Sequence, residues 1–361
     1  MLLDRRTFAA GSAALLSGCA TVGTRVASGC SAIIPVNVDE SRVICTVAGL
    51  RPYRRSGFVV RAEALGEKRL VHNYGHGGGG ITLSWGSSKL ATELGLQGHA
   101  GPVAIVGAGV MGLSTARLVQ EAGFPVTIYT AALPPETTSN IAGGQFHPFA
   151  VFHPGDVSPE FLAQYARATD YSWRRFQIMV GDDYGVRWLP TYVAGDELQE
   201  QLTPTFPPVN RRLSTAEHPF PLDSVVRYDT MYVETGRYLR QMERDVRLAG
   251  GRIEIRRFST PAEIAALAES LVFNCTGLGS RDLFNDQVLE PVRGQLAILE
   301  PQPEVRYAAL GDFGYMFPRG DGILLGGTFE RGVWNATPQP DDIARIIAAH
   351  KRFFSSFRCT A

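Results

Sequence analysis

The chain has 361 residues, of which 45% are hydrophobic and 19% are charged, and its formal net charge at pH 7 is +0. A chain of this length usually divides into two domains and can bury a large cofactor. The balanced charge gives no attraction to polyanions, so we expect no nucleic-acid partner.

The N-terminus has the layout of a bacterial export signal. Arg5 and Arg6 resemble a twin-arginine pair and are followed by a short, weakly apolar stretch. Residues 16–19 read Leu-Ser-Gly-Cys, a lipobox pattern in which Cys19 would be acylated. We therefore predict a folded protein exported to the periplasmic side and anchored by lipid at Cys19. The alternative is an incidental amphiphilic helix on a cytoplasmic protein.

Other sequence features limit the membrane and metal interpretations. No apolar run approaches the roughly 20 residues of a membrane helix, so a lipid anchor is the only membrane contact expected. The cysteines beyond Cys19 have no metal-site spacing, and neither a metal site nor a disulfide is predicted.

Two segments before residue 100 carry possible ligand-binding groups. Residues 48–54 read Ala-Gly-Leu-Arg-Pro-Tyr-Arg, and residues 71–86 contain four consecutive glycines between a predicted strand and a predicted helix. Free backbone N–H groups at a helix start stabilise negative charge, as on the N1 and C2 carbonyl edge of a reduced flavin. The alternative for this glycine run is a flexible loop.

Residues 103–114 predict a dinucleotide-binding turn. An apolar strand runs into Gly-Ala-Gly-Val-Met-Gly, with a helix at 116–122 and a second strand at 125–129. Such glycines allow a tight turn, close approach of a pyrophosphate and close helix packing. The acidic residue that usually binds the adenosine ribose is missing, because Thr130 and Ala131 stand where it is expected.

Later segments complete the pattern. Residues 236–248 predict an amphipathic helix in which Tyr238 is a core residue. Residues 137–145 follow the second strand, and residues 273–277 read Phe-Asn-Cys-Thr-Gly. Three further strand-like segments lie at 291–295, 315–318 and 325–329.

Together these motifs resemble the D-amino-acid oxidase family, from about residue 45 to residue 329. The resemblance implies FAD as cofactor and an α/β fold in which a Rossmann-type FAD-binding domain is interleaved with a mixed-sheet substrate domain. It implies FAD contacts at Gly77, Gly78, Gly79, Gly80, Ile81, Thr82, Gly107, Ala108, Gly109, Val110, Met111, Gly112, Thr137, Thr138, Ser139, Gly143, Gly144, Gln145 and Gly277.

The order of the motifs departs from the family. The arginine motif and the glycine run precede the dinucleotide turn here, whereas in the family they close the chain. A circular permutation explains this if the helix at about 89–96 ends near the strand that begins at Val103. A new pair of chain ends would then lie near Cys359 and Val43.

The predicted domains follow from these motifs. After the signal at 1–19 and a linker at 20–44, residues 45–150 and 232–290 form the FAD-binding domain. This domain includes the displaced segment 45–99. Residues 151–231 and 291–345 form the substrate domain.

The resemblance also implies the residues that act on the substrate, which are Arg51, Tyr315 and Gly78. Arg51 would hold the substrate carboxylate by paired hydrogen bonds, with Tyr315 assisting, so that the Cα–H points at flavin N5. For Arg51 the alternative is a surface ion pair, and for Tyr315 a buried strand tyrosine.

Two departures from the family concern the substrate side. Gly79 replaces an aromatic residue, and Gly311 stands where a second lid tyrosine is expected. Gln145, Phe146 and His147 are candidates for the side-chain pocket, with His147 equally interpretable as structural.

Three functional classes remain open at this point. The first is oxidation of a D-amino acid, with oxygen or a membrane quinone as electron acceptor. The second is oxidation of another small amine, such as glycine, a secondary amine or D-aspartate. The third is a degenerate flavin-binding lipoprotein.

Overall fold

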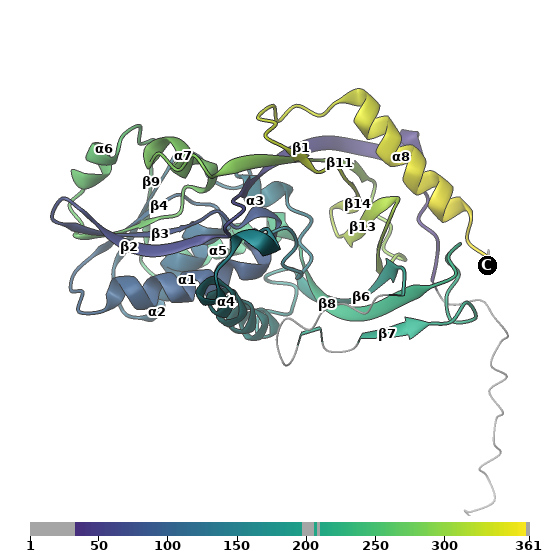
Figure 1. Cartoon of the computed structure of the whole chain (residues 1–361), viewed down its shortest axis with the longest axis horizontal. Coiled ribbons are helices and arrows are strands. Elements are labelled where there is room, and N and C mark those ends of the chain that lie inside the picture. The colour runs from purple at the N-terminus through teal and green to yellow at the C-terminus, as the bar shows by residue number, and fades with distance from the viewer. Residues whose placement is uncertain (1–32, 197–205, 208–209, 359–361) are drawn as a thin grey trace, which may run out of the picture.

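The computed structural model describes residues 33–196, 206–207 and 210–358, which form two lobes (Figure 1). Each lobe is built around one sheet, and we call them the six-stranded lobe and the nine-stranded lobe. The predicted α/β fold with a mixed second sheet is confirmed. The signal at 1–19 and residues 20–32 lie outside the described residues.

The six-stranded sheet has the order β2-β3-β10-β4-β5-β9 and is parallel except for β2. Its strands are β2 (Val59–Leu65), β3 (Lys68–Tyr74), β4 (Val103–Val106), β5 (Val126–Thr130), β9 (Arg252–Ile255) and β10 (Leu271–Asn274). The central strands are apolar throughout because helices cover both faces of a parallel sheet. Ile105 and Phe273 belong to one core cluster, and Ala104 and Val272 to the opposite one.

Helices cover this sheet on both sides, with α1, α2 and α4 below it and α6 and α7 above it in Figure 1. Their bounds are α1 (Gly80–Leu96), α2 (Val110–Glu121), α4 (Pro159–Gln177), α5 (Thr235–Leu248), α6 (Pro261–Ala265) and α7 (Ser280–Leu283). The predicted helix at 236–248 is confirmed as α5, and Tyr238 is fully buried. Its hydroxyl accepts a hydrogen bond of 2.7 Å from Trp85 Nε1.

The nine-stranded sheet has the order β1-β11-β14-β13-β12-β6-β8-β7, with β15 beside β11. Its strands are β1 (Val43–Tyr53), β6 (Val186–Ala194), β7 (Asn210–Leu213), β8 (Val225–Val233), β11 (Glu290–Leu299), β12 (Ala308–Gly311), β13 (Gly314–Arg319), β14 (Gly322–Gly326) and β15 (Glu330–Arg331). The helix α8 (Pro340–Ser355) packs Ile343, Ile346 and Ile347 against this sheet.

Short elements connect the larger ones. They are η1 (Glu40–Arg42), η2 (Gly77–Gly79), α3 (Thr138–Ile141), η3 (Pro154–Asp156) and η4 (Gly277–Gly279). In the described ranges, no helix is both long enough and apolar enough to cross a membrane.

Several segments belong to a different lobe, or end at a different residue, than the predicted domains have it. Residues 45–53 were predicted in the FAD-binding domain, but β1 pairs with β11 of the nine-stranded sheet along most of its length. The end of the predicted linker is not free either, because Val36 and Val38 are buried in the core under α8. The helix α8 also continues past residue 345, where the substrate domain was expected to end.

The helix α4 is a further correction, since it was predicted in the substrate domain and instead packs on α1. Gly86 of α1 allows the approach, because a Cβ there would overlap the Ala168 carbonyl oxygen. The Gly86 N–H donates a hydrogen bond of 2.8 Å to Ser172 Oγ. Sequence periodicity identifies the buried face of a helix but not the lobe that buries it.

Candidate active site

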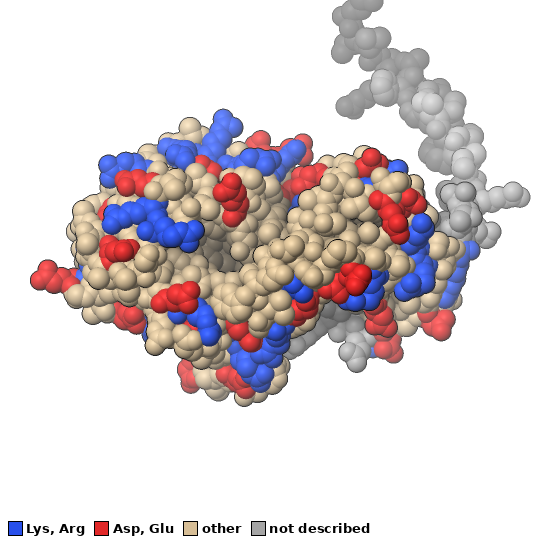
Figure 2. Space-filling view, turned by 90° about the horizontal axis from the view of Figure 1, so that it is seen from above, with Lys and Arg blue, Asp and Glu red and all other residues tan. Residues whose placement is uncertain are grey.

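A cavity of about 1050 Å³ lies between the two lobes, where the surface is hollowed (Figure 2). This volume is at the upper end of the range of small-molecule pockets, about 300–1000 Å³. The predicted residues that line it are Arg51, Gly77, Gly78, Gly80, Ile81, Gly107, Ala108, Gly109, Val110, Met111, Thr137, Thr138, Ser139, Gly143, Gly144, Gln145, Gly277 and Tyr315. The structure therefore brings together segments that are far apart in the sequence.

The dinucleotide turn between β4 and α2 depends on glycine for steric reasons. Gly107 has a φ of +108°, and a Cβ there would lie 2.5 Å from the Cys275 carbonyl oxygen. A Cβ at Gly112 would overlap the Gly107 carbonyl oxygen, so Gly112 allows helix packing and does not line the cavity. The Val110 N–H donates a 3.0 Å hydrogen bond to Ser139 Oγ, which fixes the following turn against α2.

The far end of the cavity lies where β5 and β9 end. Thr130 donates its hydroxyl to the Ala132 carbonyl oxygen at 2.7 Å, and Ala131 and Ala132 line the wall. Arg256 and Arg257 follow β9 and line the same cavity. This end of the cavity therefore has no acidic side chain at positions 130 and 131 and has two arginines, Arg256 and Arg257, in its wall.

The glycine run forms η2 and the start of α1. Gly77 has a φ of +55°, and a Cβ there would overlap the Ala150 carbonyl oxygen. That oxygen accepts a 3.2 Å hydrogen bond from the Gly78 N–H. The first-turn amides of α1 have no intrahelical acceptor, so they are available to an anionic group in the cavity.

Two residues predicted to contact the cofactor from this run do not line the cavity. A Cβ at Gly79 would point toward the Val151 side chain, 2.5 Å away. Thr82 accepts a 3.1 Å hydrogen bond from the His147 N–H and donates to the Gln145 carbonyl oxygen at 3.3 Å. These residues support the walls of the cavity, because their side-chain positions face protein.

The strand before the glycine run supplies support that the sequence analysis did not assign. Asn73 Nδ2 donates to Ser88 Oγ at 3.1 Å and to Thr115 Oγ1 at 3.2 Å, which ties β3 to α1 and α2. His76 stacks on Phe58 with ring centroids 4.9 Å apart, and burial lowers its pKa to about 3. His76 is therefore a neutral packing group.

Arg51 lies on β1 with its guanidinium over Gly294 of the neighbouring strand β11, where any Cβ would overlap it. Its Nη1 is buried and has no hydrogen-bond partner in the protein. A buried, unpaired guanidinium nitrogen in a cavity favours an anionic ligand, because desolvating it without a partner is costly.

Tyr315 lies on β13 beside Arg51. Its ring occupies the space left by Gly326, where a Cβ would overlap it. Burial raises the pKa of the Tyr315 phenol, and the Arg51 charge opposes that shift. The phenol is therefore neutral at pH 7 and can donate a hydrogen bond to the same anion as Arg51.

The wall beyond Arg51 is polar but uncharged. Gln145 Nε2 donates to the Tyr228 hydroxyl at 3.1 Å. Burial lowers the pKa of His147 to about 4, and its Nδ1 is buried without a partner. Phe146 was expected to line the side-chain pocket, but it does not line the cavity, because it is fully buried against Trp173.

Charges are distributed unevenly along the cavity. Arg51, beside Tyr315, is the charged residue that lines this end of the cavity. The other charged lining residues are Glu136, Arg256, Arg257 and Asp282, which follow β5, β9 and β10. In the described part of the chain, no three His, Cys, Asp or Glu side chains are grouped as a metal site requires.

Comparison with known proteins agrees with this geometry. The sequence profile described as FAD dependent oxidoreductase matches residues 20–94 and 102–360. The chain belongs to this family. A D-amino-acid oxidase of Streptomyces coelicolor is 32% identical over 263 residues, covering 68% of this chain and 76% of that protein. A Homo sapiens D-aspartate oxidase is 30% identical over 257 residues, covering 68% and 74%.

Solved structures of other oxidases share the fold. An iminodiacetate oxidase of Chelativorans sp. BNC1 superposes with a TM-score of 0.54 at 17% identity, covering 70% of this chain and 79% of that one. A glycine oxidase of Bacillus cereus gives a TM-score of 0.51 at 17% identity, covering 70% and 78%.

The cavity of this FAD-dependent oxidoreductase fits its cofactor. A Cβ at Gly107 or at Gly77 would collide with a backbone carbonyl oxygen. The helices α1 and α2 both begin at the cavity wall, where the Val110 N–H of α2 is already bonded to Ser139 Oγ. Both features suit a dinucleotide with a pyrophosphate and an electron-rich ring. Residues of the six-stranded lobe that line the cavity would hold FAD, and Arg51 and Tyr315 would be left for a second, smaller molecule.

Proposed function

We propose that this protein oxidises D-amino acids at the Cα–N bond, using FAD. The observation that carries the proposal is the buried, unpaired Arg51 Nη1 beside the neutral Tyr315 phenol, at one end of a dinucleotide-sized cavity. The relatives at 32% and 30% identity, a D-amino-acid oxidase and a D-aspartate oxidase, support this class of substrate.

Arg51 binds and orients the substrate. Its planar guanidinium makes two parallel charge-assisted hydrogen bonds to a carboxylate, and these fix both distance and angle. Tyr315 donates a third hydrogen bond to the same group. Gly78 lines the cavity, and its backbone packs against the protein, since a Cβ there would lie 2.6 Å from the Phe149 carbonyl oxygen.

Bound FAD would supply the hydride acceptor for the Cα hydrogen. The amino group loses a proton as the Cα–N single bond becomes a double bond, and water then hydrolyses the imino acid to a 2-oxo acid and ammonia. The chain contributes orientation, and the buried aromatic and glycine walls limit access of water.

The uncharged wall favours one kind of side chain. A second carboxylate, as in D-aspartate, would face Gln145 and the neutral His147 without a cation to pair with. Leaving a buried charge unpaired is costly. We therefore expect D-alanine, D-serine and D-asparagine to be better substrates than D-aspartate, by roughly 100-fold in kcat/KM.

Anaerobic titration tests the proposal. The oxidised flavin spectrum should bleach on adding uncharged D-amino acids and should remain on adding their L-enantiomers. Folded protein without a flavin spectrum, or a flavin that no D-amino acid bleaches, would refute it. Bleaching by glycine or sarcosine alone would move the function to oxidation of another small amine.

Oxygen is proposed as the electron acceptor in the first instance, with a membrane quinone as the alternative. The amounts of oxygen consumed and hydrogen peroxide formed per substrate should then be equal. Turnover that requires a soluble quinone analogue would identify a dehydrogenase.

We propose export and lipid attachment at Cys19, supported by Arg5, Arg6 and the Leu16 to Cys19 pattern in the sequence. Several acyl chains on one cysteine anchor more stably than the marginal attachment of a single chain. Cys19→Ala should lose membrane association, and the double change Arg5→Lys and Arg6→Lys should remain in the cytoplasm. Equal distribution of wild type and Cys19→Ala in the soluble fraction would contradict this.

We also propose that the motif order arose by circular permutation. Two features support it: the short segment 97–102 joins α1 to β4, and Lys351 Nζ of α8 lies 3.2 Å from Asp39 Oδ2, just before β1. A rearranged chain that starts at residue 101 and joins residue 358 to residue 33 through a flexible linker should bind FAD. Loss of folding in that chain would contradict the proposal.

A further inference from the structure

An aromatic pair stands at the mouth of the cavity near Arg51. Phe149 and Phe329 both line the cavity and are 60% and 47% exposed. Their ring centroids are 6.1 Å apart and the rings are nearly perpendicular, at 78°. Because both rings line the cavity and also face solvent, they lie at its opening.

The nearby hairpin does not provide this cover. Gly311 of β12 pairs with Gly314 of β13, so the turn between them is tight. The Phe313 ring in this turn stacks on Phe353 of α8, with ring centroids 3.9 Å apart. It is therefore held on α8 and does not join the aromatic pair.

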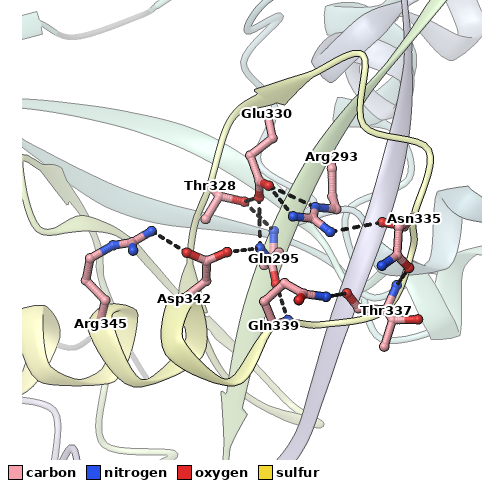
Figure 3. A network of polar contacts seen from close by, with 9 residues as sticks. All are labelled: Arg293, Gln295, Thr328, Glu330, Asn335, Thr337, Gln339, Asp342 and Arg345. Carbon is pink, nitrogen blue, oxygen red and sulfur yellow. Dashed lines mark hydrogen bonds and ion pairs between the residues drawn. The ribbon is translucent and has the colours of Figure 1, made fainter.

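Thr328 and Glu330, the neighbours of Phe329 in the sequence, belong to a network of polar side chains (Figure 3). Thr328 donates its hydroxyl to the Glu330 carboxylate and accepts a 3.1 Å hydrogen bond from the Gln295 N–H. Arg293 Nε donates to Glu330 Oε2 at 3.0 Å, and Gln295 Nε2 donates to Glu330 Oε1 at 2.8 Å.

The same network reaches α8 and is charged at pH 7. Gln295 Nε2 also donates to Asp342 Oδ2 at 2.6 Å. Burial opposes the charge on Glu330, but hydrogen bonds from Arg293, Thr328 and Gln295 lower its pKa to about 2. Glu330 thus remains a carboxylate that anchors the backbone next to Phe329.

The backbone at Phe149 is fixed against the glycine run. The Phe149 N–H donates to the His147 carbonyl oxygen at 2.8 Å, and the Ala150 carbonyl oxygen accepts from the Gly78 N–H at 3.2 Å. Both phenylalanines therefore have a fixed backbone and an exposed ring. Exposed side chains change rotamer in picoseconds to nanoseconds, whereas fixed backbone does not follow them.

We propose that Phe149 and Phe329 form a side-chain gate over the substrate end of the cavity, and that the Glu330 carboxylate positions Phe329 in it. The gate excludes water when closed and limits the size of the amino acid that enters. Its role in substrate selection rests on the proposed function, whereas its shielding of the cavity does not.

Collisional quenching tests the shielding without turnover. Iodide should quench the fluorescence of the bound flavin at least twofold more strongly in Phe149→Ala and in Phe329→Ala than in wild type. Equal quenching constants in all three proteins would overturn the gate. This result does not depend on whether any D-amino acid is a substrate.

Kinetics test the selection. The ratio of kcat/KM for D-phenylalanine to that for D-alanine should rise at least fivefold in either alanine variant, because the opening widens while Arg51 is unchanged. An unchanged ratio together with increased quenching would overturn selection by the gate. If no D-amino acid reduces the wild-type flavin, the proposed function fails and the quenching result stands alone.

Glu330→Gln tests the positioning role. It removes the charge that Arg293 holds, so quenching should increase in the direction of Phe329→Ala but by less. The matched control is Glu290→Gln. Glu290 lies on β11 and pairs with Arg331, the neighbour of Glu330 on β15. Identical quenching in both variants, at equal melting temperature, would overturn the positioning role. If Glu330→Gln does not fold, Phe149→Ala still tests the gate, because its side chain is exposed.

Discussion

The two halves of the cavity are built from different parts of the chain. Along the six-stranded lobe the walls are largely backbone, with glycines such as Gly107, where a Cβ would collide with a neighbouring carbonyl oxygen. Near Arg51 the walls are side chains that come from both lobes. The first half should therefore be sensitive to added atoms, and the second to removed or altered functional groups.

The largest effect is expected where the backbone wall is tightest. Gly107→Ala should yield protein without FAD, because the new Cβ would lie 2.5 Å from the Cys275 carbonyl oxygen at a φ of +108°. The absorbance ratio at 450 and 280 nm measures this. Gly98→Ala is the matched control, since Gly98 has a φ of +66° with nothing within 4 Å. It should cost about 1–3 kcal/mol of stability from strain alone and keep FAD.

Arg51 should show the opposite behaviour, with FAD retained and catalysis lost. Arg51→Ala removes the carboxylate ligand and should lower kcat/KM roughly 1000-fold, equal to about 4 kcal/mol, through both a higher KM and a lower kcat. Arg51→Lys should recover part of this but not the paired geometry. Arg61→Ala, on β2 with an exposed ion pair to Glu63, is the control. Unchanged kinetics in Arg51→Ala would remove Arg51 from the site.

This contrast explains what the sequence could predict. The glycine turn is readable because strand, turn and helix are contiguous, and their order alone determines the geometry at 103–114. Arg51 was predicted only by resemblance, because its surroundings depend on Gly294 of a distant strand. Nothing local distinguishes Phe146, which is core, from Gln145, which lines the cavity. The lobe of β1 was mispredicted for the same reason, since its partner β11 comes much later in the chain.

Acid pH should lower the free energy of unfolding, because His76, beside the glycine run, is held neutral in the folded protein. Unfolded His76 takes up a proton near the ordinary pKa of about 6.5, while the folded form resists protonation down to a pKa of about 3. The unfolded state thus binds more protons in this window, so stability is full above pH 6.5 and falls as the pH decreases. The expected slope is about 1.4 kcal/mol per pH unit for this one group.

His76→Phe should keep the stack on Phe58 and remove that slope. Urea unfolding at pH 7 and pH 5 measures the free energy of unfolding in both proteins. We expect the variant to lose about 2 kcal/mol less than wild type between these values. The same loss in both proteins would show that His76 is not held neutral by the fold.

Tyr315→Phe should give the smallest change, and it separates orientation from binding in the side-chain half. In the proposed function the phenol adds one hydrogen bond to a carboxylate that Arg51 already holds, so we expect the lower end of the roughly 1.5–3 kcal/mol that a hydrogen bond to a charged group contributes. We expect kcat/KM to fall about 10-fold, mostly through KM, with FAD content unchanged. The control is Tyr307→Phe, which removes a buried hydroxyl that donates to the Ile34 carbonyl oxygen at 2.9 Å, outside the cavity. A loss in kcat as large as that of Arg51→Ala would mean that Tyr315 acts on the reacting atoms themselves.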